Sequence, residues 1–235
     1  MAEKGLSYVV FSPAWMNQPV EWIPDDSNIA DLITKQAEKR PEKTALICYD
    51  REVSFGELDE LTNRLASGLI SEFGVKKGDR VATMFPNCIQ HTLAYLGINK
   101  AGAVATPINV MYREREIAYQ LSDSGAETVI ALDAFYPLIQ KAKGTTPLKN
   151  IIVSNLRDFT APDADIPPLF AAEKVSLEGA HKLVEFLDKA SPKRPEIEID
   201  GKHNLSLILY TAGMTGGTPK GVMECHFLCW GLFRP

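Results

Sequence analysis

The amino-acid sequence predicts an α/β fold in which a largely parallel sheet is flanked by helices. Hydrophobic residues make up 45% of the 235 positions, which is enough for a sizeable core. Short apolar runs alternate with helical patterns along most of the chain, as expected for parallel strands joined by crossover helices. The alternation contains no internal repeat, heptad or low-complexity tract.

The first elements are expected to be a helix, a strand and a second helix. Asn28 is placed to cap the first helix, Pro41 follows its end, and residues 44–49 form the strand. Ser54 and Glu57 form a capping-box pattern that opens the most regular amphipathic helix of the chain. Its apolar residues recur at helical spacing, and Gly74 is placed to end it: Leu58, Leu61, Leu65, Leu69 and Ile70.

The later segments continue the alternation. After a turn at Gly78 and Asp79, residues 80–85 form a predicted strand and residues 89–100 a helix. Further strands are expected at four apolar runs, 103–106, 128–132, 151–154 and 205–210. Helical patterns cover residues 113–124, 134–143 and 177–190. The polar, proline-containing stretch 155–168 is expected to be a surface excursion.

Composition excludes several classes of function. The 25 Lys and Arg residues against 30 Asp and Glu leave a formal charge of -5, without the basic excess that binding to nucleic acid requires. Residues 1–22 contain no apolar run suited to a signal peptide or a membrane span, so no transmembrane segment is expected. The cysteines do not form a disulfide framework, which favours the cytoplasm: Cys48, Cys88, Cys225 and Cys229. No metal site is expected, because Cys225, His226 and Cys229 lack a second Cys or His pair at zinc-site spacing.

Residues 210–222 form the segment most suited to chemistry, and they directly follow an apolar predicted strand. They read Tyr-Thr-Ala-Gly-Met-Thr-Gly-Gly-Thr-Pro-Lys-Gly-Val. Glycines let backbone N–H groups converge on phosphate oxygens, threonine hydroxyls add donors, and Lys220 adds a positive charge. The segment is not a Walker A loop, because Pro219 and Lys220 precede Gly221 instead of following it. Taken alone, the residues allow either an anion-binding loop or a simple turn between two strands with Lys220 in solvent.

The segment resembles the Tyr-Thr-Ser-Gly-Thr-Thr-Gly-x-Pro-Lys-Gly-Val signature of the acyl-adenylating superfamily. That superfamily contains acyl-CoA synthetases, adenylation domains of peptide synthetases, and luciferases. Two further stretches resemble it in the expected order, Val-Ser-Phe-Gly-Glu-Leu at 53–58 and the region 97–125. The second stretch includes Lys-Ala-Gly-Ala at 100–103, Pro-Ile-Asn at 107–109 and Leu-Ser-Asp-Ser-Gly at 121–125. The chain is most similar to an acyl-CoA synthetase, or fatty-acid–CoA ligase, over about residues 28–226.

The resemblance implies an ATP-dependent, AMP-forming acid–CoA ligase whose large N-terminal domain begins with this chain. Its substrates would be ATP with Mg²⁺, CoA and a carboxylic acid, with a medium- or long-chain fatty acid the most frequent choice in the family. The residues implied to bind the ATP phosphates are Thr211, Gly213, Thr215, Gly216, Gly217, Thr218 and Lys220. His226 falls where relatives carry a Thr-His pair near the site, so it is a candidate substrate-site residue. His91 and His181 are expected to be packed or solvated instead.

The chain departs from the family pattern in ways that set further expectations. Ala212 and Met214 replace hydroxyl residues or glycine, and Gly217-Thr218 adds one residue before Pro219, so phosphate binding is expected to be impaired. The Tyr-Gly-x-Thr-Glu segment, the Thr-Gly-Asp segment and the C-terminal adenylation lysine of the family are not found, so no catalytic residue is assigned. Residues 1–27 are interpreted as an extension and 28–235 as a partial domain.

The apolar run 227–233 adds to the expectation of a fragment and of self-association. Two alternatives to the ligase remain open at this point. One is an inactive remnant that binds a nucleotide or a partner, and the other is an adenylation domain that serves a carrier protein.

Overall fold

The structure, a computed structural model, describes residues 28–170, 177–211 and 218–226. At its centre is a seven-stranded sheet with the strand order β7-β6-β5-β3-β4-β8-β9. Every neighbouring pair is parallel except β8 and β9, which are antiparallel. The strands are β3 (Arg80–Met84), β4 (Val104–Pro107), β5 (Thr128–Leu132), β6 (Asn150–Ser154), β7 (His181–Lys182), β8 (Leu205–Tyr210) and β9 (Gly221–Cys225).

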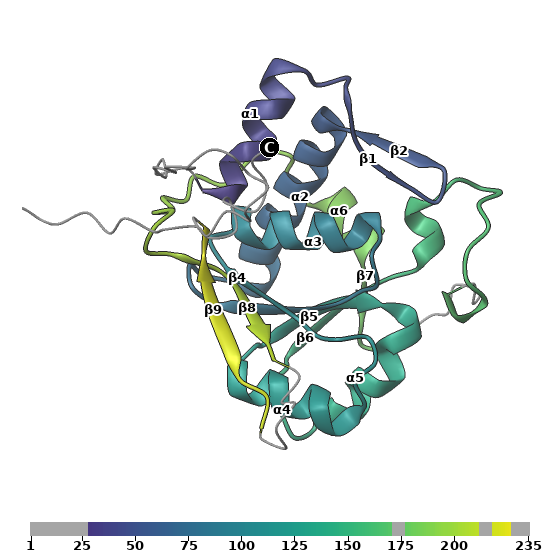
Figure 1. The fold of residues 1–235 in the computed structure, drawn as a ribbon, viewed down its shortest axis with the longest axis vertical. Coiled ribbons are helices and arrows are strands. Elements are labelled where there is room, and N and C mark those ends of the chain that lie inside the picture. Colours follow the sequence, from purple (N-terminus) through teal and green to yellow (C-terminus); the bar gives the residue numbers. More distant parts are fainter. Residues whose placement is uncertain (1–27, 171–176, 212–217, 227–235) are drawn as a thin grey trace, which may run out of the picture.

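Helices cover both faces of this sheet and complete three layers (Figure 1). One layer contains α1 (Ile29–Lys39), α2 (Phe55–Phe73), α3 (Ile89–Lys100) and α6 (Leu183–Lys189). The opposite layer contains α4 (Glu114–Ser124) and α5 (Tyr136–Lys143). Short 3-10 turns occupy Asp133–Phe135, Leu156–Phe159 and Pro168–Phe170. The α/β class with a largely parallel, helix-flanked sheet is therefore confirmed.

The ends of the first helices follow the predicted capping chemistry. Asn28 caps α1 by accepting a hydrogen bond from the Asp31 amide at 3.0 Å. Ser54 caps α2 by accepting from the Glu57 amide at 3.2 Å, although the Glu57 carboxylate pairs with Arg51. Gly74 ends α2 in the left-handed conformation, with φ 66°, which glycine adopts without a steric penalty.

The hydrophobic core lies on both faces of the central strands. All five residues of β5 are buried, as are four of the five in β6. Strands that are covered on both faces by helices need continuous apolar runs instead of alternation, and this is why 128–132 and 151–154 stand out in the sequence as short apolar segments. The central strands β5 and β6 are therefore packed on both faces.

Three details differ from the sequence-based expectations. Residues Arg51–Ser54 form an unpredicted strand, β2, which pairs with β1 (Thr44–Cys48) as a separate two-stranded sheet. The helix expected over 177–190 begins only at Leu183, because His181 and Lys182 pair with β6 as β7. In addition, Gly221–Cys225 forms the unpredicted strand β9.

The stretch 155–168 is only partly a surface excursion. Four of its apolar side chains are buried in the main core, namely Leu156, Phe159, Ala164 and Ile166. The expectation of a surface excursion holds for the exposed residues of the stretch and is wrong for these four, because the prolines and charges between them concealed their contribution to the core.

Candidate functional site

The predicted anion-binding segment connects β8 to β9 as the turn of an antiparallel hairpin. Tyr210 and Gly221 are the last paired residues of the two strands. On its other side β8 runs parallel to β4, with Ala105 opposite Leu207, so the segment leaves the sheet beside the carboxyl end of β4. Ligand sites of open α/β sheets lie outside the carboxyl ends of their strands. The segment thus joins two paired strands, as the simple-turn alternative expected, and this position is compatible with an anion-binding loop.

Part of this loop lies outside the described residues. The candidates Gly213, Thr215, Gly216 and Gly217 are among residues 212–217, as are the departures Ala212 and Met214. Their roles and the expected impairment of phosphate binding stay predictions. Thr211, Thr218 and Lys220 are described, and all three are exposed.

Thr211 and Lys220 face each other across the base of the loop. The Thr211 amide donates to the Lys220 carbonyl oxygen at 3.0 Å. The Lys220 amide donates in turn to the Thr211 hydroxyl oxygen at 3.2 Å. The Lys220 ammonium makes no ion pair with any other residue that the structure describes. An exposed ammonium that is not paired within the described residues, at the neck of a glycine-rich loop, is suited to attract a phosphate chain.

Helix α4 supports both sides of the loop, a role the sequence did not reveal. The Tyr210 hydroxyl donates to Asp123 Oδ2 at 2.7 Å, and the Tyr119 hydroxyl donates to the Pro219 carbonyl oxygen at 2.9 Å. Burial and the hydrogen bond to Asp123 raise the pKa of Tyr210 above its ordinary value, so this phenol keeps its proton and acts as a donor. In the sequence, Asp123 is visible only within the Leu-Ser-Asp-Ser-Gly resemblance, where helix-end chemistry explains the segment without the loop.

A cavity of about 220 Å³ lies beside the hairpin, between β8, α4 and the turn after β4. Gln120 lines it and donates to Thr106 Oγ1 at 3.1 Å and to the Pro107 carbonyl at 2.9 Å. Asn109 accepts from the Met111 amide at 2.9 Å, which is ordinary turn chemistry. The Gln120 contacts therefore tie α4 to the end of β4, and the Asn109 contact stabilises the turn that follows this strand.

His226 directly follows β9 and contacts the start of α1. Its Nδ1 atom accepts a hydrogen bond from the Ile29 amide at 3.4 Å, and the residue is only 1% exposed. Burial lowers the pKa of His226 to about 4, although the nearby Asp31 carboxylate opposes the shift. The imidazole is therefore neutral near pH 7 and holds an amide of the first helical turn. A role in a substrate site stays a prediction.

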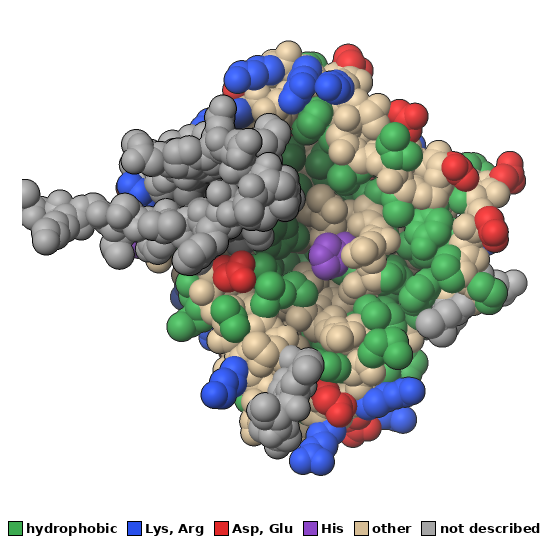
Figure 2. All heavy atoms as spheres, in the orientation of Figure 1, with side chains coloured by type: hydrophobic (Ala, Val, Ile, Leu, Met, Phe, Trp, Pro, Cys, Tyr) green, Lys and Arg blue, Asp and Glu red, His purple; other side chains and the backbone are tan. Residues whose placement is uncertain are grey.

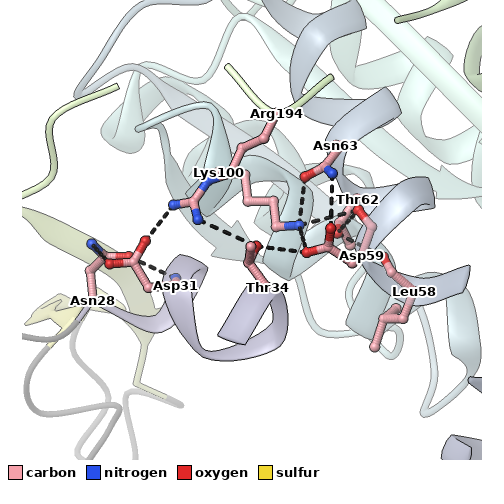
Figure 3. Close-up of polar contacts among 9 residues, drawn as sticks. All are labelled: Asn28, Asp31, Thr34, Leu58, Asp59, Thr62, Asn63, Lys100 and Arg194. Atoms are coloured by element: carbon pink, nitrogen blue, oxygen red, sulfur yellow. Dashed lines mark hydrogen bonds and ion pairs between the residues drawn. The ribbon is translucent and has the colours of Figure 1, made fainter. Parts of the chain in front are cut away.

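The most deeply buried charge of the described chain is Lys100, on the side of the sheet covered by α1, α2 and α3 (Figure 3). Its ammonium lies 2.7 Å from Asp59 Oδ1 and 2.7 Å from Asn63 Oδ1. The Thr34 hydroxyl donates to the same Asp59 oxygen at 2.6 Å. Burial lowers the pKa of Lys100 to about 8, while the bond to Asp59 opposes that shift. Since these contacts join α1, α2 and α3, the cluster is structural.

Metal-binding side-chain clusters and membrane-spanning helices are both absent from the residues that the structure describes. No group of three His, Cys, Asp or Glu side chains there is arranged to hold a metal ion, and Cys229 lies outside this part of the chain. None of the helices described is long and apolar enough to cross a membrane.

Comparison with known proteins identifies a family and several relatives. The family model described as AMP-binding enzyme matches residues 33–227. The long-chain-fatty-acid–CoA ligase of Bacillus subtilis (strain 168) is 31% identical over 208 residues, which are 86% of this chain and 37% of the relative. A long-chain-fatty-acid–CoA ligase of Mycobacterium tuberculosis (strain ATCC 25618 / H37Rv) is 32% identical over 85% of this chain and 35% of the relative. The chain thus spans little more than a third of the length of these relatives.

Solved structures give the same result for the fold. An anthranilate CoA ligase in complex with anthranoyl-AMP superposes with a TM-score of 0.75 at 25% identity, over 90% of this chain and 38% of that structure. A long-chain-fatty-acid-CoA ligase from Archaeoglobus fulgidus superposes with a TM-score of 0.69 at 28% identity, over 88% of this chain and 38% of that structure.

Proposed function

The chain belongs to the AMP-binding enzyme family, and we propose that it supplies the ATP-phosphate-binding part of an AMP-forming acid–CoA ligase. The observation that carries the proposal is the β8–β9 hairpin, whose glycine- and threonine-rich turn is closed by Thr211 and Lys220 with the ammonium exposed. The substrates of the proposed reaction are ATP taken up with Mg²⁺, a carboxylic acid and CoA. The names of the relatives from Bacillus subtilis and Mycobacterium tuberculosis favour a long-chain fatty acid as the acid.

In the proposed reaction the loop acts on the leaving group. A carboxylate oxygen of the acid forms a bond to the α-phosphorus of ATP, and the bond between that phosphorus and the bridging oxygen breaks to release pyrophosphate. The acyl group then passes from the adenylate to the CoA thiol, which loses its proton, and AMP leaves. Nucleotidyl transfer depends mainly on positioning and charge neutralisation. Lys220 and the hydroxyls of Thr211 and Thr218 would hold the β- and γ-phosphates and stabilise the charge that develops on them.

No residue of this chain is proposed to form a covalent intermediate or to abstract a proton. Mg²⁺ is proposed to arrive bound to the ATP phosphates, and the described residues include no carboxylate cluster arranged to hold it separately. We also propose a cytoplasmic location, which the free thiols of Cys48, Cys88 and Cys225 support.

The test is ATP and pyrophosphate binding by the full 235-residue chain, measured by isothermal titration calorimetry with Mg²⁺ present. Lys220→Met should weaken binding about tenfold, because a charge-assisted contact to phosphate contributes roughly 1.5 kcal/mol or more. Lys141→Met is the control. It removes an exposed lysine on α5, outside the β8–β9 hairpin, and should leave the Kd for ATP unchanged. Equal binding by the parent and Lys220→Met, or no ATP binding by the parent, would overturn the proposal and favour an inactive remnant.

A further inference from the structure

Helix α4 contacts the phosphate-binding hairpin on both sides of its turn. On the β8 side, Asp123 accepts the hydroxyl hydrogen of Tyr210 at 2.7 Å. On the β9 side, the Tyr119 hydroxyl donates to the carbonyl oxygen of Pro219 at 2.9 Å. The rings of Tyr119 and Tyr210 also meet edge to face, with their centres 6.4 Å apart. One face of one helix therefore touches the residue before Thr211 and the residue before Lys220.

We propose that Tyr119 and Asp123 are positioning residues that hold the two stems of the hairpin at the separation needed to bind the ATP phosphates. This inference rests on the proposed function. Neither residue is proposed to touch the nucleotide.

The contact at Pro219 is important because of what proline lacks. Pro219 has no backbone N–H, so its carbonyl oxygen is its only main-chain hydrogen-bonding group. The Tyr119 hydroxyl donates its hydrogen bond to that carbonyl oxygen. The peptide unit between Pro219 and Lys220 is then held from one side by Tyr119 and from the other by the Lys220 amide, which donates to Thr211 at 3.2 Å. The direction in which the Lys220 side chain leaves the backbone follows from the orientation of this peptide unit.

The helix that provides these contacts is itself fixed to the sheet. Near its middle, Gln120 donates to Thr106 Oγ1 and to the Pro107 carbonyl at the end of β4. At its carboxyl end, Arg80 at the start of β3 donates to the Ser124 carbonyl at 2.6 Å. Movement of the hairpin stems relative to β3 and β4 must therefore break contacts to α4. A preorganised site needs this kind of support, since loops alone hold donors less accurately.

The charge of Asp123 argues for positioning and against direct contact with phosphate. A carboxylate facing a triphosphate would repel it, whereas here Asp123 Oδ2 accepts from the Tyr210 hydroxyl. Burial and this acceptor raise the pKa of Tyr210, so the hydrogen bond persists through the physiological pH range. Asp123 is exposed, and water competes for it, so the effect of each single change should be moderate.

The experiment combines two measurements on the full chain. The first is the Kd for ATP with Mg²⁺, and the second is the hydrogen-exchange rate of the Thr211 and Lys220 amides, both of which are hydrogen-bonded across the neck of the loop. Tyr119→Phe and Asp123→Ala should each raise the Kd about fivefold and speed exchange at both amides by a similar factor. Asp123→Asn keeps an acceptor for Tyr210 and should stay within about twofold of the parent.

Tyr136→Phe is the matched control. It also deletes a hydroxyl that donates to a backbone carbonyl, that of Glu178, but it does so on α5. Exchange at Thr211 and Lys220 should be unchanged in this variant.

The outcomes separate this inference from the proposed function. If exchange at both amides is the same in Tyr119→Phe, Asp123→Ala and the parent, the positioning role is wrong, whatever happens to the Kd. If the parent does not bind ATP, the proposed function fails, while faster exchange in the two variants still supports the positioning role. A higher Kd without faster exchange would indicate direct contact with the nucleotide and would also overturn the inference.

Discussion

His226 shows how burial gives a single side chain a defined protonation state. Its Nδ1 accepts from the amide of Ile29, in the first turn of α1, where unpaired N–H groups need acceptors. A protonated imidazole would lose this acceptor and would place a charge in a site that is 1% exposed. The neutral form is therefore favoured in the folded chain, and the link between β9 and α1 depends on it.

We predict that this histidine makes the chain sensitive to acid. The pKa of His226 is lowered from 6.5 to about 4 in the folded chain, so the unfolded chain binds the proton more readily. Stability is then lost as the pH falls from about 6.5 towards 4, by about 2–3 kcal/mol in the free energy of unfolding. Urea unfolding at pH 7.5 and pH 4.5 should show this loss, and His226→Gln, which keeps an acceptor but cannot be protonated, should lack that part of it.

His203→Gln is the control for this measurement. His203 pairs with Asp200 on the surface, with its side chain 79% exposed. Its replacement should leave the difference between the two pH values close to that of the parent. If His226→Gln and the parent lose the same stability on acidification, the buried imidazole is not the cause.

At the scale of elements, the contact between α2 and α3 depends on a glycine. A Cβ atom added at Gly97 would lie 2.7 Å from Leu65 Cδ2 and 2.9 Å from Leu65 Cβ and Cγ. Leu65 is fully buried, so its side chain has little room to move. Glycine therefore allows the two helices to approach more closely than alanine would.

We predict that Gly97→Ala destabilises the chain by about 1–3 kcal/mol, because overpacking a buried contact outweighs the gain of about 1 kcal/mol in helix propensity. Gly144→Ala is the control, since a Cβ there would meet no atom within 4 Å. Denaturant unfolding measures both, and the double variant with Leu65→Ala should lose less stability than the sum of the two single losses. A stabilising Gly97→Ala would show that the helices separate at little cost.

The cluster of Lys100, Asp59 and Asn63 leads to a second prediction about these helices. The Lys100 side chain is 0% exposed and that of Asp59 17% (Figure 3). Lys100→Met would leave the Asp59 carboxylate without its cation, and removing one partner of a buried pair costs about 3 kcal/mol or more. Lys149→Met, which breaks an exposed pair with Glu127, should cost less than about 1 kcal/mol. Thermal unfolding of the two variants should differ clearly, and similar melting temperatures would contradict a buried-pair role.

The elements that could be predicted are those whose signals are local. Asn28, Ser54 and Gly74 mark helix ends by their own hydrogen bonds or backbone angles, and the buried strands β5 and β6 are short apolar runs. Strand β2 could not be predicted, because Arg-Glu-Val-Ser contains one apolar residue and is stabilised only by pairing with β1. The same applies to His181 and Lys182, which become a strand through β6.

Some residues of the candidate site could likewise be predicted from the sequence, and others could not. Thr211, Thr218 and Lys220 belong to one contiguous motif, and the sequence shows it directly. Tyr119 and Asp123 could not be assigned to it, because Tyr119 is separated from Pro219 by 100 residues and Asp123 from Tyr210 by 87. The parallel pairing of β4 with β8 places the motif beside the strand that precedes α4.

On the scale of the whole molecule, apolar side chains gather near the end of the sheet formed by β8 and β9. Leu209, Val222 and Met223 are 41%, 46% and 66% exposed. Strand β9 is last in the sheet order, so within the described residues one side of its backbone has no strand partner. On the face shown in Figure 2, hydrophobic side chains cover much of the centre while charged side chains lie mainly around the rim. Apolar surface next to an open strand edge favours association.

We therefore predict that the isolated 235-residue chain associates with itself through the β9 edge at tens of micromolar, a concentration range typical for such contacts. Sedimentation velocity should show species larger than a monomer that increase with concentration. Met223→Lys places a charge on the edge strand and should shift the distribution towards monomer, as lysine does on natural edge strands. Met111→Lys introduces the same change at a methionine that is 78% exposed outside the sheet, and should have no such effect. A monomeric parent chain across this range, or equal effects of the two substitutions, would show that β9 is not the contact.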